Sequence, residues 1–127
     1  MTVSNHFILH AVERMSHVVP ISYRRIFNGY GVYHNGVQFA IIVNDHLYFR
    51  ADDLSRNLYL AKKMAAFQPH AVTMGETSFF QLPDEVLSNP SELIHWMRIA
   101  VEAAQNAYTL SDEESFTETL VRHRHSR

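Results

Sequence analysis

Cysteine is the first absence in this sequence of 127 residues. Without it the chain has no disulfide framework, no thiolate metal ligand and no thiol nucleophile, a composition that suits a reducing cytosol. No apolar run approaches the roughly 20 residues that span a bilayer. The first ten residues also lack the basic start of a signal peptide. We therefore expect a cytoplasmic protein with no membrane segment.

A net charge of one sign is also missing. The chain has 11 lysines and arginines and 13 acidic residues, which gives a formal net charge of -2. A protein that holds duplex DNA on its own usually carries a clear cationic excess or stripe. The charge balance therefore argues against autonomous DNA binding.

Recognisable catalytic motifs are absent as well. The sequence has no nucleophile elbow, no H-E-x-x-H helix and no clustered pair of acids at a familiar spacing. We expect a non-enzymatic protein with no catalytic residue and no cofactor.

What the chain does have is the composition of one globular domain, with 46% apolar and 19% charged residues. Its central stretch, residues 23–50, holds most of the turn signals. Asn35-Gly36 lies between two aromatic-rich runs and predicts a tight hairpin, because both residues tolerate positive φ. Asn44-Asp45 offers a second turn before a strand over His46–Arg50. The sequence predicts a three-stranded meander, with Phe39–Val43 as a strand covered on both faces.

Helices are predicted on either side of this meander. Residues 5–18 form an amphipathic helix. Its inward face consists of Phe7, Ile8, Ala11, Val12 and Met15. Asp52 or Asp53 caps a second helix that runs through Met64. Its predicted inward stripe consists of Leu54, Leu58 and Ala61.

The last helix has the clearest start signal. Asn89 is the expected N-cap, Pro90 the first helical residue, and Glu92 the acid of a capping box. From Thr109 onward acidic and basic residues alternate in blocks. We therefore expect one domain over residues 1–108, followed over residues 109–127 by a mixed-charge tail that is mobile or loosely docked.

A second hairpin is predicted between these helices. Residues 70–74 and 77–82 read as its strands, with Phe79 and Phe80 on opposite faces. Pro83 then starts one helical turn through Leu87. The resulting order, α-β-β-β-α-β-β-α, predicts a two-layer α+β fold with helices gathered on a mainly antiparallel sheet.

These motifs, in this order, resemble the N-terminal domain of the TfoX/Sxy family of bacterial competence regulators. The family pattern is approximately R-R-M-F-G-G-Y-G-L-Y, a short turn with glycine, F-A-L-I and then L-Y-L-K. The matching residues are Arg24, Arg25, Phe27, Gly29, Tyr30, Gly31, Tyr33, Gly36, Phe39, Ala40, Ile42, Leu47, Tyr48 and Arg50, then residues 79–85, and then Leu93, Trp96 and Ala100. The sequence departs from the pattern at Asn28, where the family has a glycine. Asparagine is the other residue that best tolerates left-handed geometry, so we expect the turn to be kept.

The resemblance implies a fold similar to type III secretion chaperones and to YgaC-like proteins. It also implies a regulatory interaction module that acts as a transcriptional co-activator through protein–protein contacts. The implied partners are the cyclic-AMP receptor protein or RNA polymerase, and the chaperone-like fold is compatible with a homodimer. The alternative is a YgaC-like or chaperone-like protein that binds a peptide or partner segment without a direct role in transcription.

The arginines and aromatic residues of the meander are the candidate site for a protein partner. Arginine pairs well with acidic groups, and tyrosine and phenylalanine supply much interface energy. The plainer interpretation puts the rings in the sheet and the arginines in solvent, and strand alternation predicts a mixture of the two. The candidate partner-binding residues are Arg24, Arg25, Phe27, Tyr30, Tyr33, Tyr48 and Arg50. The expected structural turn residues are Asn28, Gly29, Gly31, Asn35 and Gly36.

Histidines of the first helix are weak candidates for a metal site. His6, His10 and His17 share one helical face with Glu13, at spacings that a metal ion could use. A solvated polar face is the usual explanation for this spacing, and we expect no metal.

Overall fold

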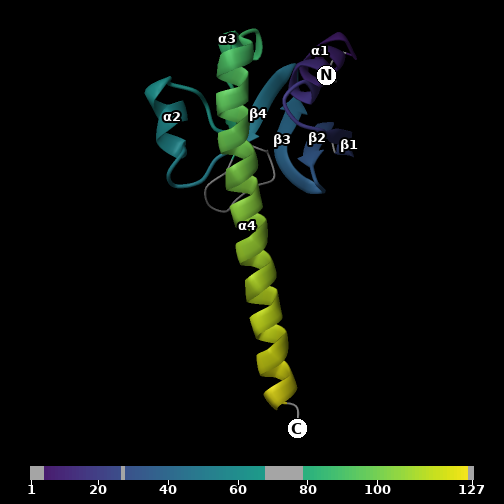
Figure 1. The fold of residues 1–127 in the computed structure, drawn as a ribbon, viewed down its shortest axis with the longest axis vertical. Coiled ribbons are helices and arrows are strands. Elements are labelled where there is room, and N and C mark those ends of the chain that lie inside the picture. Colours follow the sequence, from purple (N-terminus) through teal and green to yellow (C-terminus); the bar gives the residue numbers. More distant parts are fainter. Residues whose placement is uncertain (1–4, 27, 68–78, 126–127) are drawn as a thin grey trace.

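The computed structural model describes residues 5–26, 28–67 and 79–125, with side chains up to residue 109, and Figure 1 shows its fold. The elements are α1 (Asn5–Ser16), β1 (Ser22–Ile26), β2 (Gly29–His34), β3 (Val37–Val43), β4 (His46–Arg50), α2 (Arg56–Ala61), β5 (Phe79–Gln81), α3 (Asp84–Leu87) and α4 (Pro90–His125). The strands form one antiparallel sheet in the order β1-β2-β3-β4-β5. The predicted α+β fold with an antiparallel sheet is confirmed.

The meander has four strands where the sequence predicts three. Both expected turns are confirmed, since Asn35 and Gly36 have φ of 52° and 79°, and Asn44-Asp45 are also left-handed. The difference lies earlier, where residues 22–26 and 29–34 form two antiparallel strands. Their pairs run from Ile26 opposite Gly29 to Ser22 opposite Tyr33. Asn28-Gly29 carries the same Asn-Gly signal as the next hairpin, so the sequence marked this reversal, and treating the residues before Asn35 as a single strand was wrong.

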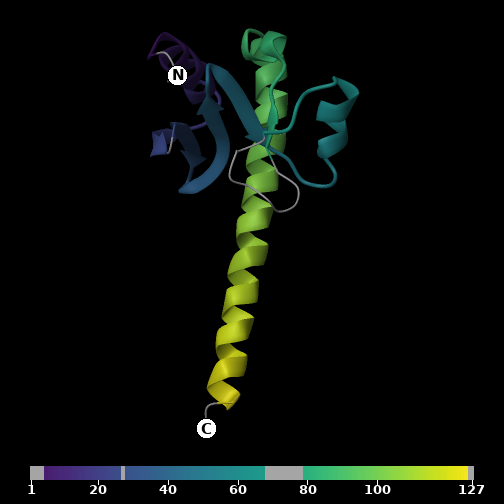
Figure 2. The same cartoon turned by 180° about the vertical axis from the view of Figure 1, so that it is seen from behind.

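One face of the sheet carries the core together with α1 and α4. On the helices the buried residues include Ile8, Ala11 and Met15, then Leu93, Met97 and Ala100, as the helical periodicity predicts. On the strands they include Val32, Ala40, Ile42, Leu47, Phe49 and Phe80. The first turns of α4 cross this face, and the C-terminal half of the helix then continues beyond every other labelled element (Figures 1 and 2).

The predicted inward stripe of α2 is wrong. Leu54 is 88% exposed and Leu58 38% exposed, whereas Tyr59 is fully buried. The Tyr59 ring stacks on Phe80 at 5.4 Å and meets the edge of Trp96 at 4.9 Å. The helix has only six residues, so contacts with distant aromatic rings, and not a helical period, decide which residue faces inward.

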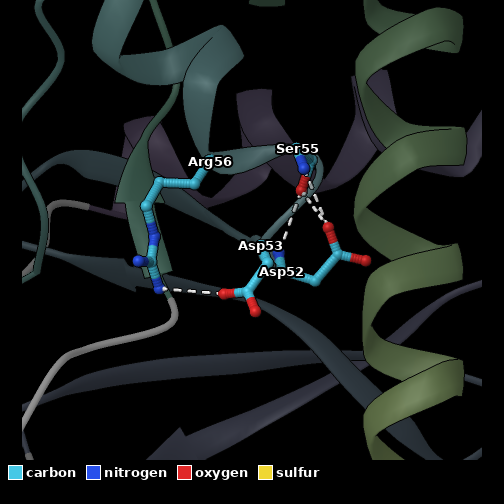
Figure 3. A network of polar contacts seen from close by, with 4 residues as sticks. All are labelled: Asp52, Asp53, Ser55 and Arg56. Carbon is cyan, nitrogen blue, oxygen red and sulfur yellow. Dashed lines mark hydrogen bonds and ion pairs between the residues drawn. The ribbon is translucent and has the colours of Figure 1, made fainter.

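The predicted cap and end of α2 are wrong, since Ser55 and not Asp52 or Asp53 is the N-cap, and the helix ends at Ala61 and not at Met64. Asp52 instead shapes the turn that leads into the helix. The Asp52 carboxylate accepts hydrogen bonds from the Ser55 backbone N–H at 2.8 Å and from its hydroxyl at 2.9 Å (Figure 3). The Ser55 hydroxyl oxygen accepts in turn from the Asp52 N–H. These hydrogen bonds, the one from the Ser55 N–H above all, lower the pKa of Asp52. Asp53 reaches Arg56 at 3.8 Å across the exposed side of the same turn.

The start of α4 follows the predicted capping pattern in part. Asn89 Oδ1 accepts a hydrogen bond from the Glu92 N–H at 3.2 Å. The Glu92 carboxylate, however, accepts from Trp96 Nε1, so the expected second half of the capping box is replaced by a bond within the helix. The helix then continues to His125, so the backbone of residues 109–125 is helical. The domain boundary at residue 108 and the mobility of the tail stay predictions.

The predicted second hairpin lies mostly outside the described residues, because these omit residues 68–78. Its described part, β5, pairs with β4, and Phe79 and Phe80 face opposite sides as expected. Ala65 and Phe67 make backbone hydrogen bonds along the other side of β5. Among the helices described, none is both long enough and apolar enough to cross a membrane.

Candidate protein-interaction surface

The strand register divides the candidate partner-binding residues between the two faces of the sheet. Arg25 lies opposite Tyr30, which lies opposite the buried Ile42, so these residues share the face that carries the helices. Arg24 lies opposite Gly31 on the other face. Tyr33, Tyr48 and Arg50 belong to this second face by alternation along their strands. The predicted mixture of faces is therefore observed.

Arg24 is held by Tyr33 on the second face. Its guanidinium carbon lies 5.1 Å from the centre of the Tyr33 ring, and its Nε donates a hydrogen bond to the Tyr33 hydroxyl at 3.2 Å. A Cβ atom at Gly31 would lie 2.8 Å from that hydroxyl oxygen. Glycine at position 31 thus leaves room for the ring that supports Arg24.

Arg25 makes the matching contact on the helix face. Its guanidinium carbon lies 5.9 Å from the centre of the Tyr30 ring, and Tyr23 packs against the same ring at 5.9 Å. Tyr23 is 41% exposed and was not among the sequence candidates. The sequence could have identified Tyr23 from its position two residues before Arg25, because residues two apart in a strand share a face.

The two arginines are exposed cations, and the described residues offer neither of them an ion pair. A guanidinium that stacks on a ring keeps its N–H edges available for other acceptors. We call Arg24 and Arg25 the arginine pair; its members project from neighbouring positions of β1 to opposite faces of the sheet.

Arg50 and Tyr48 lie in a different and more buried setting. Arg50 rests over the Phe79 ring at 5.4 Å, and Tyr48 meets the Phe67 ring at 5.2 Å. Burial lowers the pKa of Arg50 and raises the pKa of Tyr48. These two candidates therefore pack on the β4–β5 side of the sheet, and sequence reasoning missed their partners because both lie far along the chain.

The expected turn residues have three different outcomes. Asn35 and Gly36 form the β2–β3 turn as predicted, and Asn28 is exposed in the turn before β2. Gly29 and Gly31, in contrast, lie within β2, so their assignment as turn residues is wrong. Both permit close approach instead, since a Cβ at Gly29 would collide with the carbonyl oxygen of Ile42. Phe27, also a candidate, lies outside the described residues.

A hollow lies where the start of β1 meets the end of β2. Its volume is about 330 Å³, and it is lined by Ser22, Tyr23, Arg24, Tyr33 and Gly36. The lining thus combines two aromatic rings with one member of the arginine pair.

The histidine face of α1 does not close around an ion. His17 Nε2 lies 3.9 Å from Glu13 Oε2, with both side chains exposed. His6, His10 and Glu13 line a hollow at the surface of the helix. In the ranges that the structure describes, no three histidines or acids come close enough to hold a metal ion.

The sequence matches the model of a known protein family. The TfoX N-terminal domain matches residues 13–104, which is more than half of the chain and includes the whole four-stranded meander. No curated protein matches the sequence.

Proposed function

The chain belongs to the TfoX N-terminal domain family, and on that premise we propose that it is a non-enzymatic regulatory module that assists transcription through protein–protein contacts. Its partner in this proposal is the cyclic-AMP receptor protein or RNA polymerase, met in the bacterial cytoplasm. The chain contributes a docking surface and leaves DNA recognition to the partner. A formal net charge of -2 supports that division of roles.

The observation that carries the proposal is the arginine pair on β1. Arg24 and Arg25 are exposed, and neither forms an ion pair among the described residues, so both charges are available to an acidic partner. Tyr33 and Tyr30 hold their guanidinium groups in place. Restrained side chains lose less entropy when a partner binds, and arginine with tyrosine is the composition of interface hot spots.

Affinity capture from a bacterial lysate tests this function. The chain is tagged and incubated at moderate salt, with one sample treated with nuclease, and the bound proteins are identified by mass spectrometry. The proposal predicts recovery of the cyclic-AMP receptor protein or of polymerase subunits in both samples. Loss of these proteins after nuclease treatment would mean that DNA bridges them to the chain, and the proposal of direct contact would fail.

Two matched variants make the capture specific. The arginine-pair variant, Arg24→Ala/Arg25→Ala, removes two exposed positive charges from β1. The control variant, Arg14→Ala/Arg98→Ala, removes two exposed positive charges from α1 and α4. The proposal predicts that only the first variant loses the partner. Equal recovery by both variants would place the docking surface elsewhere.

A third hollow favours a chaperone-like alternative. Its volume is about 380 Å³, and Val18, Val19, Met97 and Val101 give it an apolar part between the end of α1 and α4. Such a surface suits a hydrophobic side chain of a bound peptide. In this alternative the chain holds a partner segment and has no direct role in transcription. Replacement of the half-buried Val101 by Gln would then release the bound protein, whereas the arginine-pair variant would keep it.

A further inference from the structure

The two edges of the sheet differ in the part of the chain that the structure describes. At β5 the outer side is occupied: the Phe67 N–H donates to the Phe79 carbonyl at 2.8 Å, and the Gln81 N–H donates to the Ala65 carbonyl at 2.9 Å. At β1 no described segment pairs along the outer side. β1 lies on the side of the molecule away from α2, and no labelled element lies beyond it (Figures 1 and 2).

An unpaired strand edge is a template for another strand. Alternate residues of β1 direct their N–H and C=O groups away from β2, where an extended chain can bond to them. Residues 22–25 are exposed, so no side chain layer of the core shields the edge. The 330 Å³ hollow at the Ser22–Tyr33 end of the β1–β2 pair includes Arg24 in its lining, close to this edge.

The charge of β1 decides whether a second copy of this chain or a strand with acidic residues is the better occupant of this edge. In an antiparallel pair of two β1 strands, centring the pair on Arg24 sets that residue against its own copy, and centring it on Arg25 does the same for Arg25. Like charges directly opposite each other destabilise a strand pair. A second copy of this chain is therefore a poor occupant, and a strand that carries carboxylates is a good one.

The positions of the two arginines define that strand further. Arg24 and Arg25 are adjacent in β1, so they point to opposite faces of the sheet. A single acidic residue on an added strand reaches one face only. Two acidic residues at neighbouring positions reach both.

We propose that β1 binds an extended segment of a partner protein as an added strand, and that this segment carries acidic residues at two adjacent positions. The inference rests on the proposed function as a protein-binding module and names the surface and the chemistry of the partner. Backbone hydrogen bonds along β1 supply the pairing, and the arginine pair selects the acidic sequence.

A synthetic peptide tests the inference with the intact chain. The probe is a fluorescein-labelled eight-residue peptide with two adjacent glutamates at its centre and valine and threonine on both sides. Its binding is measured by fluorescence polarisation. The comparison peptides replace both glutamates by glutamine, or methylate every second backbone nitrogen so that pairing along one edge is blocked.

The acidic probe is expected to bind, and both comparison peptides are expected to bind more weakly. The arginine-pair variant should lose about fivefold in affinity, on the order of two exposed ion pairs, and the control variant should lose none. Replacement of the pair by lysines, which keeps the charge, should restore part of the binding. Amide exchange should slow at residues 22–26 when the probe is present.

Other results would overturn the inference. Equal binding of the methylated peptide would show that no strand is added. Probe binding that leaves the exchange of β1 unchanged would place the peptide elsewhere, and concentration-dependent dimers with slowed β1 exchange would make a second copy the occupant. No binding of the probe, together with capture of transcription proteins by the natural chain but not by the arginine-pair variant, would reject the strand mechanism and leave the proposed function standing.

Discussion

Replacement of Tyr59 by Phe should make the protein more stable. The Tyr59 side chain is fully buried between Phe80 and Trp96, and its hydroxyl has no hydrogen-bond partner among the described residues. A buried hydroxyl without a partner costs about 1–3 kcal/mol of folding free energy. The substitution removes that cost and leaves a space smaller than a methyl group, which gives back a part of it. We expect the free energy of unfolding to rise by about 1 kcal/mol.

The same residue makes a prediction about alkaline pH. Burial raises the pKa of Tyr59 well above its ordinary value of 10.0, so the folded state keeps the neutral hydroxyl while the unfolded chain ionises. Ionisation of this group therefore leaves the free energy of unfolding unchanged below pH 10 and lowers it as the pH rises further. The loss amounts to about 1.4 kcal/mol per pH unit for one group. The Tyr59→Phe variant lacks this slope, although Tyr48, whose pKa burial also raises, adds its own pH dependence to both proteins.

Urea unfolding measures both effects. Circular dichroism gives the free energy of unfolding at pH 7 and at several values between pH 9 and 11, and the fluorescence of Trp96, the single tryptophan, gives an independent transition. The stability gap between variant and natural chain should widen above pH 10. A variant that is less stable at pH 7 would show that the hydroxyl is hydrogen-bonded in the native protein, and the reasoning would be refuted.

Three further substitutions test the fold and the site. Met97→Ala opens a cavity in the core and should lower the free energy of unfolding by about 2–5 kcal/mol in urea titrations; a loss below 1 kcal/mol would contradict the burial of this side chain. Asp52→Ala removes the hydrogen bonds from Ser55 and should cost about 1 kcal/mol at pH 7. Because the pKa of Asp52 is lowered on folding, this gap should shrink as the pH falls below 3.8, and a gap that persists there would rule out the carboxylate as its cause. Gly31→Ala should displace the Tyr33 ring and abolish the ring-current shift of the guanidinium above it in NMR spectra, with little change in stability; an unchanged shift would refute the close approach.

Local chemistry made the predictable parts of the fold predictable. Asn35-Gly36 specifies a hairpin through the φ angles that the two residues tolerate, whatever surrounds them. The start of α4 at Asn89-Pro90 is equally local, because the amide side chain and the fixed proline φ act within one turn. The periodicity of α1 spans three turns and correctly identified its buried face.

Tertiary contacts decided the parts that the sequence did not reveal. In the short helix α2, the aromatic partners of Tyr59 select the inward residue and leave Leu54 in solvent. At the site, the arginines and tyrosines were predicted as one set, but only the register of β1 with β2 shows which ring supports which arginine. The pairing of Arg50 with Phe79 joins residues far apart in sequence, and no local pattern marks it.

Transcription reconstituted from purified components tests the central claim most directly. The reaction contains RNA polymerase, the cyclic-AMP receptor protein and a promoter that depends on it, with or without the chain. A co-activator that works through the arginine pair predicts more transcript with the natural chain and with Arg14→Ala/Arg98→Ala, and no increase with Arg24→Ala/Arg25→Ala. A transcript level that none of the three proteins changes would contradict the co-activator role and favour the chaperone-like alternative.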